Sequence, residues 1–550
     1  MVDFKQTHAA LPQREETRHV TVTHAPQRDG SRLTAIPSSA ITPAEMSLLG
    51  IDLGTTGVKA VAFSAEGRVL ASAYREYPLQ SPRPGWAELD GRLVWRRAEE
   101  VLKEAAAKTR RDPIRAIASS SQGEAVVPVD AAGKVLAASM VSFDNRSTAE
   151  VKRLNSGVGI DRLFKITGHP LNTTHTLPKL MWVKKHEPKL IRSAARFLCF
   201  GDYALYRLTG GEAAATDYSL AGRTMFFDIR KCRWDEDLLG LAGVGTDQMS
   251  SPVPSGTPVG EVPAKIAKRL GLPKGVAVVA GGHDQPAGAL GAGVTRPGVA
   301  LDSIGTVECL VISLPKPVLN KKMLGSNFCS YHHTAPGLYV TLAYNFTGGS
   351  LLRWYRDTLA QSEMETARRR GRDVYDLICA DMPPGPTGLL VLPHFTTTGT
   401  PHFDPHSKGA ILGLTLGTTR PEIVKGLLEG ISYEMAHNLE LLKAAGVKVK
   451  EVRASGGGAK SAVWAQMKAD IYGLPVAVPD SSEAVSLGAA ILAGVGIGEY
   501  SDVDEGVRET VRIKRVFRPE RKRAKAYRGH LERYKEVYPR LADLFHRMRP

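Results

Sequence analysis

Residues 49–70 read LGIDLGTTGVKAVAFSAEGRVL, which predicts a strand, a tight turn and a second strand. The apolar run Leu49–Ile51 ends at Asp52, residues Gly54–Gly57 form the turn, and Val58–Phe63 returns as an apolar strand. Glycines let a phosphate approach the backbone, and a carboxylate at a strand end can hold Mg²⁺ or its waters. Ordinary turn chemistry explains the glycines equally well. The position of Asp52 favours nucleotide binding.

A second stretch repeats this pattern in the later half of the chain. Residues 298–312 read GVALDSIGTVECLVI, again an apolar strand, a turn with Gly305 and Thr306, and an apolar strand. Two phosphate-type hairpins a whole domain apart indicate a duplicated domain that closes around one nucleotide.

Composition places the chain among ordinary globular proteins. Its 550 residues allow two or three domains, and 43% hydrophobic and 23% charged residues are typical values. No apolar run reaches the roughly 20 residues of a membrane span, so we expect a soluble protein that does not enter a membrane. The five cysteines show no C-x-x-C spacing, which favours a reducing cytoplasm and gives no metal cluster.

The net charge of +16 raises the question of nucleic acid, but no groove-reading motif accompanies it. Local charge is enough to attract an anionic nucleotide.

Residues 1–45 contain four prolines and little apolar periodicity, and we expect a disordered extension, with Met46 as a possible true start. Acidic residues argue against a transit peptide, and an apolar signal core is missing.

Polar residues follow several predicted strands at the point where ligands bind in α/β sheets. The strand Ile114–Ala118 leads into Ser119–Glu124, and the strand Met140–Phe143 leads into Asp144. The buried strand Val276–Ala280 leads into Gly281–Pro286, which contains Asp284. On local grounds Asp284 is also a candidate helix N-cap.

Further motifs are explained by local structure alone. Pro84–Asp90 is a turn that contains Trp86, Pro178 starts a helix, and the triple glycine in Ala454–Ser461 leads into a helix, where it can cradle a phosphate or a purine. The tail from Lys514 is basic and then helical, with apolar residues on one face, so we expect a packing helix. We expect helices over residues 91–109, 197–209, 421–434, 462–472 and 484–495.

In this order, from about Met46 to Pro550, these motifs resemble the FGGY family of carbohydrate kinases. The resemblance implies an α/β fold of two actin-like (ribonuclease H-like) domains with a cleft for ATP and sugar between them. It divides the chain into an extension, 1–45; an N-terminal sugar-binding domain, 46–296; a C-terminal nucleotide-binding domain, 297–500; and a basic helical tail, 501–550.

The resemblance also implies an ATP-dependent, cytoplasmic kinase that phosphorylates a hydroxyl of a small sugar or polyol with Mg²⁺, and it is compatible with a homodimer. By this resemblance, Asp284 is expected to be the general base and Asp52 to hold the metal. The expected nucleotide-binding residues are Asp52, Gly54, Thr55, Thr56, Lys59, Gly305, Thr306, Gly456, Gly457, Gly458 and Ala459. The expected substrate-binding residues are Trp86, Gln122, Gly123, Glu124, Asp144, Asp284 and Gln285.

One loop departs from the family patterns and limits the substrate assignment. D-xylulose kinases typically carry a Met-His pair where this chain has Gln122-Gly123-Glu124, and glycerol kinases carry Gln-Arg-Glu. We expect a ketopentose, pentitol or tetritol, with a xylulose-like sugar favoured. Two alternatives stay open: an ATPase like actin or the heat-shock chaperones, and a catalytically inactive sugar sensor.

Overall fold

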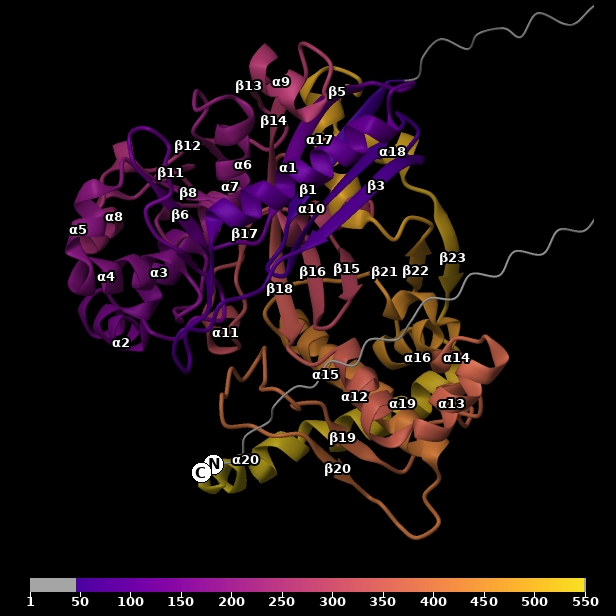
Figure 1. The fold of residues 1–550 in the computed structure, drawn as a ribbon. Helices are drawn as coiled ribbons and strands as arrows, with labels where there is room; N and C mark the ends of the chain where they lie inside the picture. Colours follow the sequence, from indigo (N-terminus) through magenta and orange to yellow (C-terminus); the bar gives the residue numbers. More distant parts are fainter. Residues whose placement is uncertain (1–45, 549–550) are drawn as a thin grey trace, which may run out of the picture. The chain divides into compact units, whose positions relative to one another are not determined.

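The computed structural model describes residues 46–548. The first half of this range is built on a six-stranded sheet with the order β13-β14-β5-β1-β2-β3 (Figure 1). Its elements are β1 Ser47–Leu53, β2 Gly57–Phe63, β3 Val69–Glu76, β4 Glu88–Leu89, α1 Gly91–Lys108, β5 Ile114–Ser121, β6 Val126–Val129, β7 Ser139–Met140, α2 Thr148–Gly157, α3 Ile160–Thr167, α4 Thr176–His186, α5 Pro188–Ser193, β8 Arg196–Cys199, α6 Phe200–Leu208, β9 Ala215–Asp217, α7 Tyr218–Arg223, β10 Phe227–Asp228, β11 Arg233–Trp234, α8 Glu236–Ala242, β12 Ser251–Val253, β13 Pro258–Glu261, α9 Ala264–Leu270, β14 Ala277–His283 and α10 Asp284–Gly291.

The second half is built on a seven-stranded sheet with the order β17-β18-β16-β15-β21-β22-β23. Its elements are β15 Val299–Ile304, β16 Glu308–Leu314, α11 Lys321–Gly325, β17 Tyr331–His332, β18 Tyr339–Asn345, α12 Gly349–Leu359, α13 Gln361–Arg370, α14 Val374–Ile378, β19 Leu390–Leu392, β20 Ala410–Leu412, α15 Arg420–Ala444, β21 Glu451–Ser455, α16 Ala462–Tyr472, β22 Val476–Pro479, α17 Ala484–Gly496, α18 Val503–Thr510, β23 Ile513–Phe517, α19 Arg521–Lys535 and α20 Val537–Arg547.

The two sheets repeat one arrangement. In the first, the hairpin β1-β2 is antiparallel, and β1 runs parallel to β5, which runs parallel to β14. In the second, the hairpin β15-β16 is antiparallel, and β15 runs parallel to β21, which runs parallel to β22. The predicted duplication, with one hairpin leading each sheet, is therefore confirmed.

Helices α10 and α17 bring the two halves into backbone contact. A Cβ atom on Gly488 of α17 would lie 1.9 Å from the carbonyl oxygen of Ala287, and one on Gly291 of α10 would lie 1.9 Å from that of Ala484. No side chain fits at such distances, so glycine is required where the helices cross. Since Asp284 begins α10, this crossing ties its position to the second half of the chain.

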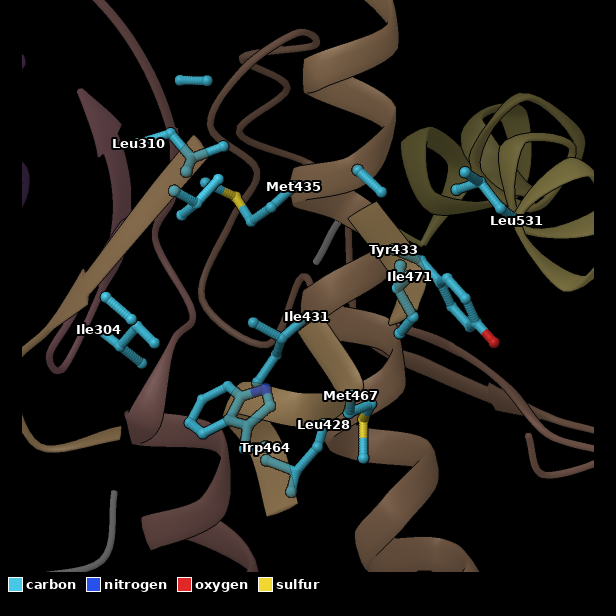
Figure 2. Packing of buried hydrophobic residues seen from close by; sticks show 14 of the residues in the cluster. Ile304, Leu310, Leu428, Ile431, Tyr433, Met435, Trp464, Met467, Ile471 and Leu531 are labelled. Carbon is cyan, nitrogen blue, oxygen red and sulfur yellow. The ribbon is translucent and has the colours of Figure 1, made fainter. Parts of the chain in front are cut away.

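The core of the second half lies between its sheet and the long helices (Figure 2). Ile304 and Leu310 come from the second hairpin, Ile431 from α15 and Trp464 from α16, and all four are buried. Leu531 of α19 is buried in the same cluster. The tail therefore packs on this domain, as its apolar face predicts, and β23 extends the domain's sheet.

One expected element is different. We expected a single helix over 197–209, whereas residues Arg196–Cys199 form β8, which pairs with β6, and the helix α6 begins at Phe200. Pairing between distant segments decided this strand, and local periodicity does not report such pairing. Helix α4 begins at Thr176, two residues before the proline that we took as its start.

Within residues 46–548, none of the helices has the length and apolar character to cross a bilayer. The expected extension, 1–45, lies outside the described residues.

Candidate active site

Asp52 occupies the end of β1, directly opposite Lys59 of β2 across the hairpin ladder. The hydroxyl of Ser120, at the end of the neighbouring strand β5, donates to Oδ1 of Asp52 over 3.2 Å. Burial and then the negative charge of Asp284 raise the pKa of Asp52 to about 7. Two carboxylates that are far apart in the sequence thus lie close enough for the charge of Asp284 to act on the ionisation of Asp52.

The turn after Asp52 is closed by its own backbone and braced by Gln122. The amide of Gly54 donates to the carbonyl of Gly57 over 3.0 Å. Thr55 Oγ1 donates to Gln122 Oε1, and Gln122 Nε2 donates to the carbonyl of Gly54, each over 3.3 Å. We expected Gln122 to bind substrate hydroxyls, and in this structure its amide is bonded to the phosphate-type turn instead.

Asp284 is the first residue of α10, directly after β14. Its Oδ1 atom is buried and accepts no hydrogen bond from the described residues, although Nε2 of His283 lies 3.2 Å away. Burial raises the pKa of Asp284 to about 6, against the opposing charge of Arg223. The neighbouring Gln285 also has a buried, unpartnered side-chain oxygen, Oε1. Buried polar atoms without partners are rare in native proteins and indicate a place for a ligand.

Glu124 and Arg223 form a buried ion pair. Ser142 Oγ donates to the other carboxylate oxygen of Glu124 over 2.8 Å. Glu124 has a φ of +63°, a left-handed conformation that is costly for a residue with a side chain. Strain of this kind is common at binding sites, where the surrounding structure fixes one side chain in place.

Asp144 has partners that we did not expect. Arg146 Nη2 and the backbone amide of Ala87 donate to its Oδ2 over 2.7 and 2.8 Å, and the Arg146 amide donates to Oδ1 over 3.0 Å. The Arg146 guanidinium lies 3.5 Å from the ring centroid of Trp86 and also pairs with Glu88 at 2.5 Å. The carboxylate of Asp144 therefore fixes Arg146, and Arg146 supports Trp86.

The triple-glycine loop lies against the second hairpin. Gly456 has a φ of +88°, and a Cβ atom on it would lie 2.6 Å from the carbonyl oxygen of Ile304, one residue before Gly305. The amide of Gly349 donates to the carbonyl of Gly305 over 2.8 Å, and the amide of Gly348 donates to that of Thr306 over 3.0 Å. Gly456 thus brings the triple-glycine loop against the hairpin, and Gly348 and Gly349, at the start of α12, brace the turn of the hairpin.

A cavity of about 520 Å³ opens beside this loop. Its lining includes Ser455, Gly456, Ala459, Lys460, Asp480, Ser481, Lys514 and Arg515. The volume suits a nucleoside, and the basic side chains suit an anionic ligand. Gly457 and Gly458 are not in the lining, and a Cβ atom on Gly458 would lie 2.3 Å from Cγ2 of Ile304, so that glycine allows close packing.

Sequence reasoning missed three residues beside Asp284. Arg223 ends α7, Tyr331 begins β17, and both are buried, with the Arg223 guanidinium 5.5 Å from the Tyr331 ring centroid. His283 is the third, and its Nδ1 lies 2.8 Å from the Tyr331 hydroxyl. No local pattern marks Arg223 or Tyr331. The only available signal was the immediate neighbourhood of His283 and Asp284 in the sequence.

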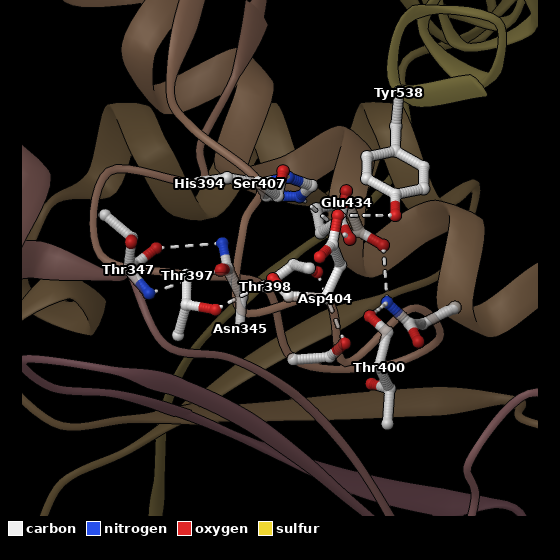
Figure 3. Close-up of polar contacts among 12 residues, drawn as sticks. Asn345, Thr347, His394, Thr397, Thr398, Thr400, Asp404, Ser407, Glu434 and Tyr538 are labelled. Carbon is white, nitrogen blue, oxygen red and sulfur yellow. Dashed lines mark hydrogen bonds and ion pairs between the residues drawn. The ribbon is translucent and has the colours of Figure 1, made fainter. Parts of the chain in front are cut away.

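The loop that includes Pro393–Phe395 and Pro401–Pro405 is held by polar contacts within its own domain (Figure 3). His394 Nδ1 and Ser407 Oγ are 2.6 Å apart, and Thr397 Oγ1 donates to the carbonyl of Asp404 over 2.9 Å. Tyr538 of α20 donates to the Asp404 carboxylate over 3.0 Å. This network attaches the tail to the loop.

Comparison with family models identifies the family of this chain. The N-terminal domain of the FGGY family of carbohydrate kinases matches residues 47–291, and its C-terminal domain matches residues 300–497. The chain belongs to the FGGY family of carbohydrate kinases. It is therefore a phosphotransferase, for which ATP is the phosphoryl donor that the family implies, and the alternative of an actin-like or chaperone-like ATPase is set aside.

Individual FGGY relatives cover nearly the whole described chain. The xylulose kinase of Bacillus subtilis (strain 168) is 30% identical over 499 residues, which are 90% of this chain and 97% of that protein. The autoinducer-2 kinase of Yersinia enterocolitica is 32% identical over 507 residues, 89% of this chain and 94% of that one. The crystal structure of xylulose kinase from Rhodospirillum rubrum superposes with a TM-score of 0.81 at 30% identity and covers 91% and 100% of the two chains.

Proposed function

We propose that this FGGY kinase transfers the γ-phosphoryl group of ATP to a hydroxyl of a ketopentose, pentitol or tetritol, with a xylulose-like ketose favoured. The observation that carries the proposal is Oδ1 of Asp284, a buried carboxylate oxygen without a hydrogen-bond donor among the described residues. It lies beside the fixed pair of Glu124 and Arg223, whose charge acts on the Asp284 carboxylate.

In the proposed reaction Asp284 takes the proton from the acceptor hydroxyl while that oxygen attacks the γ-phosphorus, and ADP leaves. Glu124 and Gln285 bind other hydroxyls of the acceptor, because carboxylate and amide oxygens suit a polyol. Trp86 and Gly123 belong to the acceptor side of the proposal as well. Asp144 and Gln122 act indirectly, since the partners of Asp144 are Arg146 and Ala87 and those of Gln122 are in the turn.

On the nucleotide side, we propose that the β- and γ-phosphates bind to both hairpins. The residues are Gly54, Thr55, Thr56 and Lys59 of the first hairpin and Gly305 and Thr306 of the second. Gly456, Gly457, Gly458 and Ala459 take the adenosine part, beside the 520 Å³ cavity.

Asp52 fits a magnesium ion. Its raised pKa reflects a half-buried carboxylate next to another acid, and a divalent cation there would favour the charged form. Residues 46–548 contain no cluster of three or more acidic, histidine or cysteine ligands. Mg²⁺ usually takes one or two carboxylates together with phosphates and waters, and the single carboxylate of Asp52 beside the turn fits that pattern. When bound, the ion would neutralise charge on the phosphates.

The acceptor assignment rests on the names of the compared relatives, and one loop limits it. Two of the compared relatives are named xylulose kinases, and the third is named an autoinducer-2 kinase. The loop Gln122–Glu124 places a glycine where the compared family patterns place a larger residue, so the acceptor side differs from both. A cytoplasmic location and a homodimer belong to the same proposal, and the five free thiols are consistent with a reducing compartment.

A screen of ADP release tests the proposal. The purified protein with Mg·ATP is offered ketoses, aldoses, pentitols and tetritols in turn, and a reaction without acceptor is the control. We expect ADP release that depends on one of the small ketoses or polyols. ADP release without any acceptor, or sugar binding without phosphate transfer, would contradict the proposal, and the second result would indicate a sugar sensor.

A further inference from the structure

His283 is enclosed at the end of β14, immediately before Asp284. Its side chain is 6% exposed, and its backbone amide donates to Ser219 Oγ over 2.9 Å. The backbone therefore holds the residue in place, and the imidazole lies between Tyr331 on one side and Asp284 on the other.

The hydrogen bonds around His283 indicate its tautomer. Burial and the positive charge of Arg223 lower the pKa of His283 well below its usual value, so the ring is neutral and carries one proton. Burial raises the pKa of Tyr331 well above its usual value, so its phenol keeps its proton. Among the described residues the phenol has one hydrogen-bonding partner, Nδ1 of His283 at 2.8 Å. If the phenol donates to Nδ1, the ring proton is on Nε2, the atom 3.2 Å from Oδ1 of Asp284.

Gly123 makes room for this ring. A Cβ atom on Gly123 would lie 3.0 Å from Cδ2 and 3.1 Å from Nε2 of His283, and 3.1 Å from Cγ of Arg223. A larger residue at position 123 would press on the imidazole edge that faces Asp284. The glycine at position 123 therefore leaves the space that the His283 ring occupies, so the two residues depend on each other.

We propose that His283 is a positioning residue for Asp284: Nε2–H of His283 donates to one lone pair of Oδ1 of Asp284 when both substrates are bound, and thereby fixes the orientation of the carboxylate toward the acceptor hydroxyl. In the structure the two atoms are close but not aligned as a hydrogen bond, and such contacts often tighten in the reactive complex. This inference rests on the proposed role of Asp284 as the base.

The charged and titratable groups near His283 are consistent with a fixed donor. Asp284 follows it on α10, Arg223 approaches from α7 and Tyr331 from β17, while His169, from the segment after α3, packs against Tyr331 with ring centroids 5.1 Å apart. Burial lowers the pKa of His169 well below its usual value, so this ring is also neutral. Arg223 is then the cation that acts on His283, and a neutral imidazole is the expected donor.

Three variants of the full-length enzyme test the inference. His283→Leu removes the donor, and we expect kcat to fall by as much as about 100-fold, because a displaced catalytic group can cost that much. The pH below which kcat declines should rise in this variant. The Asp284 carboxylate loses a hydrogen-bond donor that stabilises its charged form, so its pKa increases. His283→Gln places an amide N–H near the position of Nε2, so it should restore most of kcat and return the acidic decline of kcat to its wild-type pH. Tyr331→Phe keeps the ring but frees Nδ1 and should give an intermediate loss.

Two results would overturn the inference. His283→Leu with unchanged kcat and an unchanged acidic limb would show that Nε2 does not act on Asp284. Equal losses in His283→Leu and His283→Gln, in proportion to a lower melting temperature and with the limb unmoved, would show that the ring only fills space. If Asp284→Asn keeps full kcat, the proposed base is wrong. If Asp284→Asn is inactive while His283→Leu is normal, only the present inference fails.

Discussion

Lys59 Nζ lies 2.5 Å from Oε2 of Glu483, so the hairpin β1-β2 is ion-paired to the residue that precedes α17 in the second half of the chain. Both side chains are partly exposed, at 32% and 23%, and the pair itself adds little stability. Its importance is positional, because it holds a lysine beside the turn that we assign to the phosphates.

Lys59→Met should therefore act on the nucleotide. Loss of a hydrogen bond to a charged group costs roughly 1.5–3 kcal/mol, which corresponds to a rise of about tenfold or more in KM for Mg·ATP, with little change in KM for the acceptor. Steady-state kinetics with each substrate varied in turn measures this. Lys134→Met, an exposed lysine in a turn, is the matched control. Equal rises in both KM values would contradict the assignment.

Glu124→Gln should act on the acceptor. The amide keeps the shape of the side chain and can still accept from Arg223, but a substrate hydroxyl loses a charged partner, at roughly 1–3 kcal/mol. We expect KM for the acceptor to rise about 5- to 150-fold while KM for Mg·ATP stays nearly constant. Glu236→Gln, on the exposed start of α8, controls for the chemical change. Parallel weakening of both substrates would indicate a structural role.

The pH dependence should report both carboxylates. Burial raises the pKa of Asp52 to about 7 and that of Asp284 to about 6, and the proposed reaction needs both groups ionised. Activity is then present above these values and is lost as pH falls through them. We expect log kcat/KM for Mg·ATP, measured without excess free Mg²⁺ so that it reports the free enzyme, to decline between about pH 7 and 6 and to approach a slope of two below that range. A limb near pH 4, the ordinary range of aspartate, would contradict the raised values.

Lys468 tests the support of the second hairpin. Its side chain is fully buried, its Nζ lies 3.0 Å from Asp302 Oδ2, and it also pairs with Glu308, so it connects α16 to both strands of the hairpin. Lys468→Met leaves two buried carboxylates without their cation and should lower the free energy of unfolding by about 3–5 kcal/mol. Urea-induced unfolding measures the change, with the exposed Lys522→Met as control. An unchanged midpoint would show that the carboxylates find other partners.

Both hairpins could be predicted from sequence because their pattern is local. In each one an apolar strand, a glycine-containing turn and a second strand follow one another without interruption, and the observed ladders begin and end at the expected residues to within a few positions. The helices after the triple-glycine loop and before the tail were predicted for the same reason.

The environment of Asp284 could not be predicted in this way. Arg223 and Tyr331 reach it from α7 and β17, and nothing in their local sequence points to the end of β14. Asp144 is a further case: we expected it directly after a strand over residues 140–143, but β7 ends at Met140, and the engagement of Asp144 by Arg146 was not expected. Sequence patterns locate polar groups at strand ends, but the partner of each group depends on the packed fold.

The central claim is that Asp284 is the general base, and Asp284→Asn tests it most directly. Asparagine keeps the size of the side chain, and the N-cap of α10 is His283 rather than Asp284, so the melting temperature should stay nearly constant. Because general-base assistance contributes about 10²–10⁴-fold, kcat at saturating acceptor and Mg·ATP should fall at least ~100-fold, while Asp237→Asn, on the exposed start of α8, should leave it unchanged. A wild-type kcat in Asp284→Asn would contradict the account.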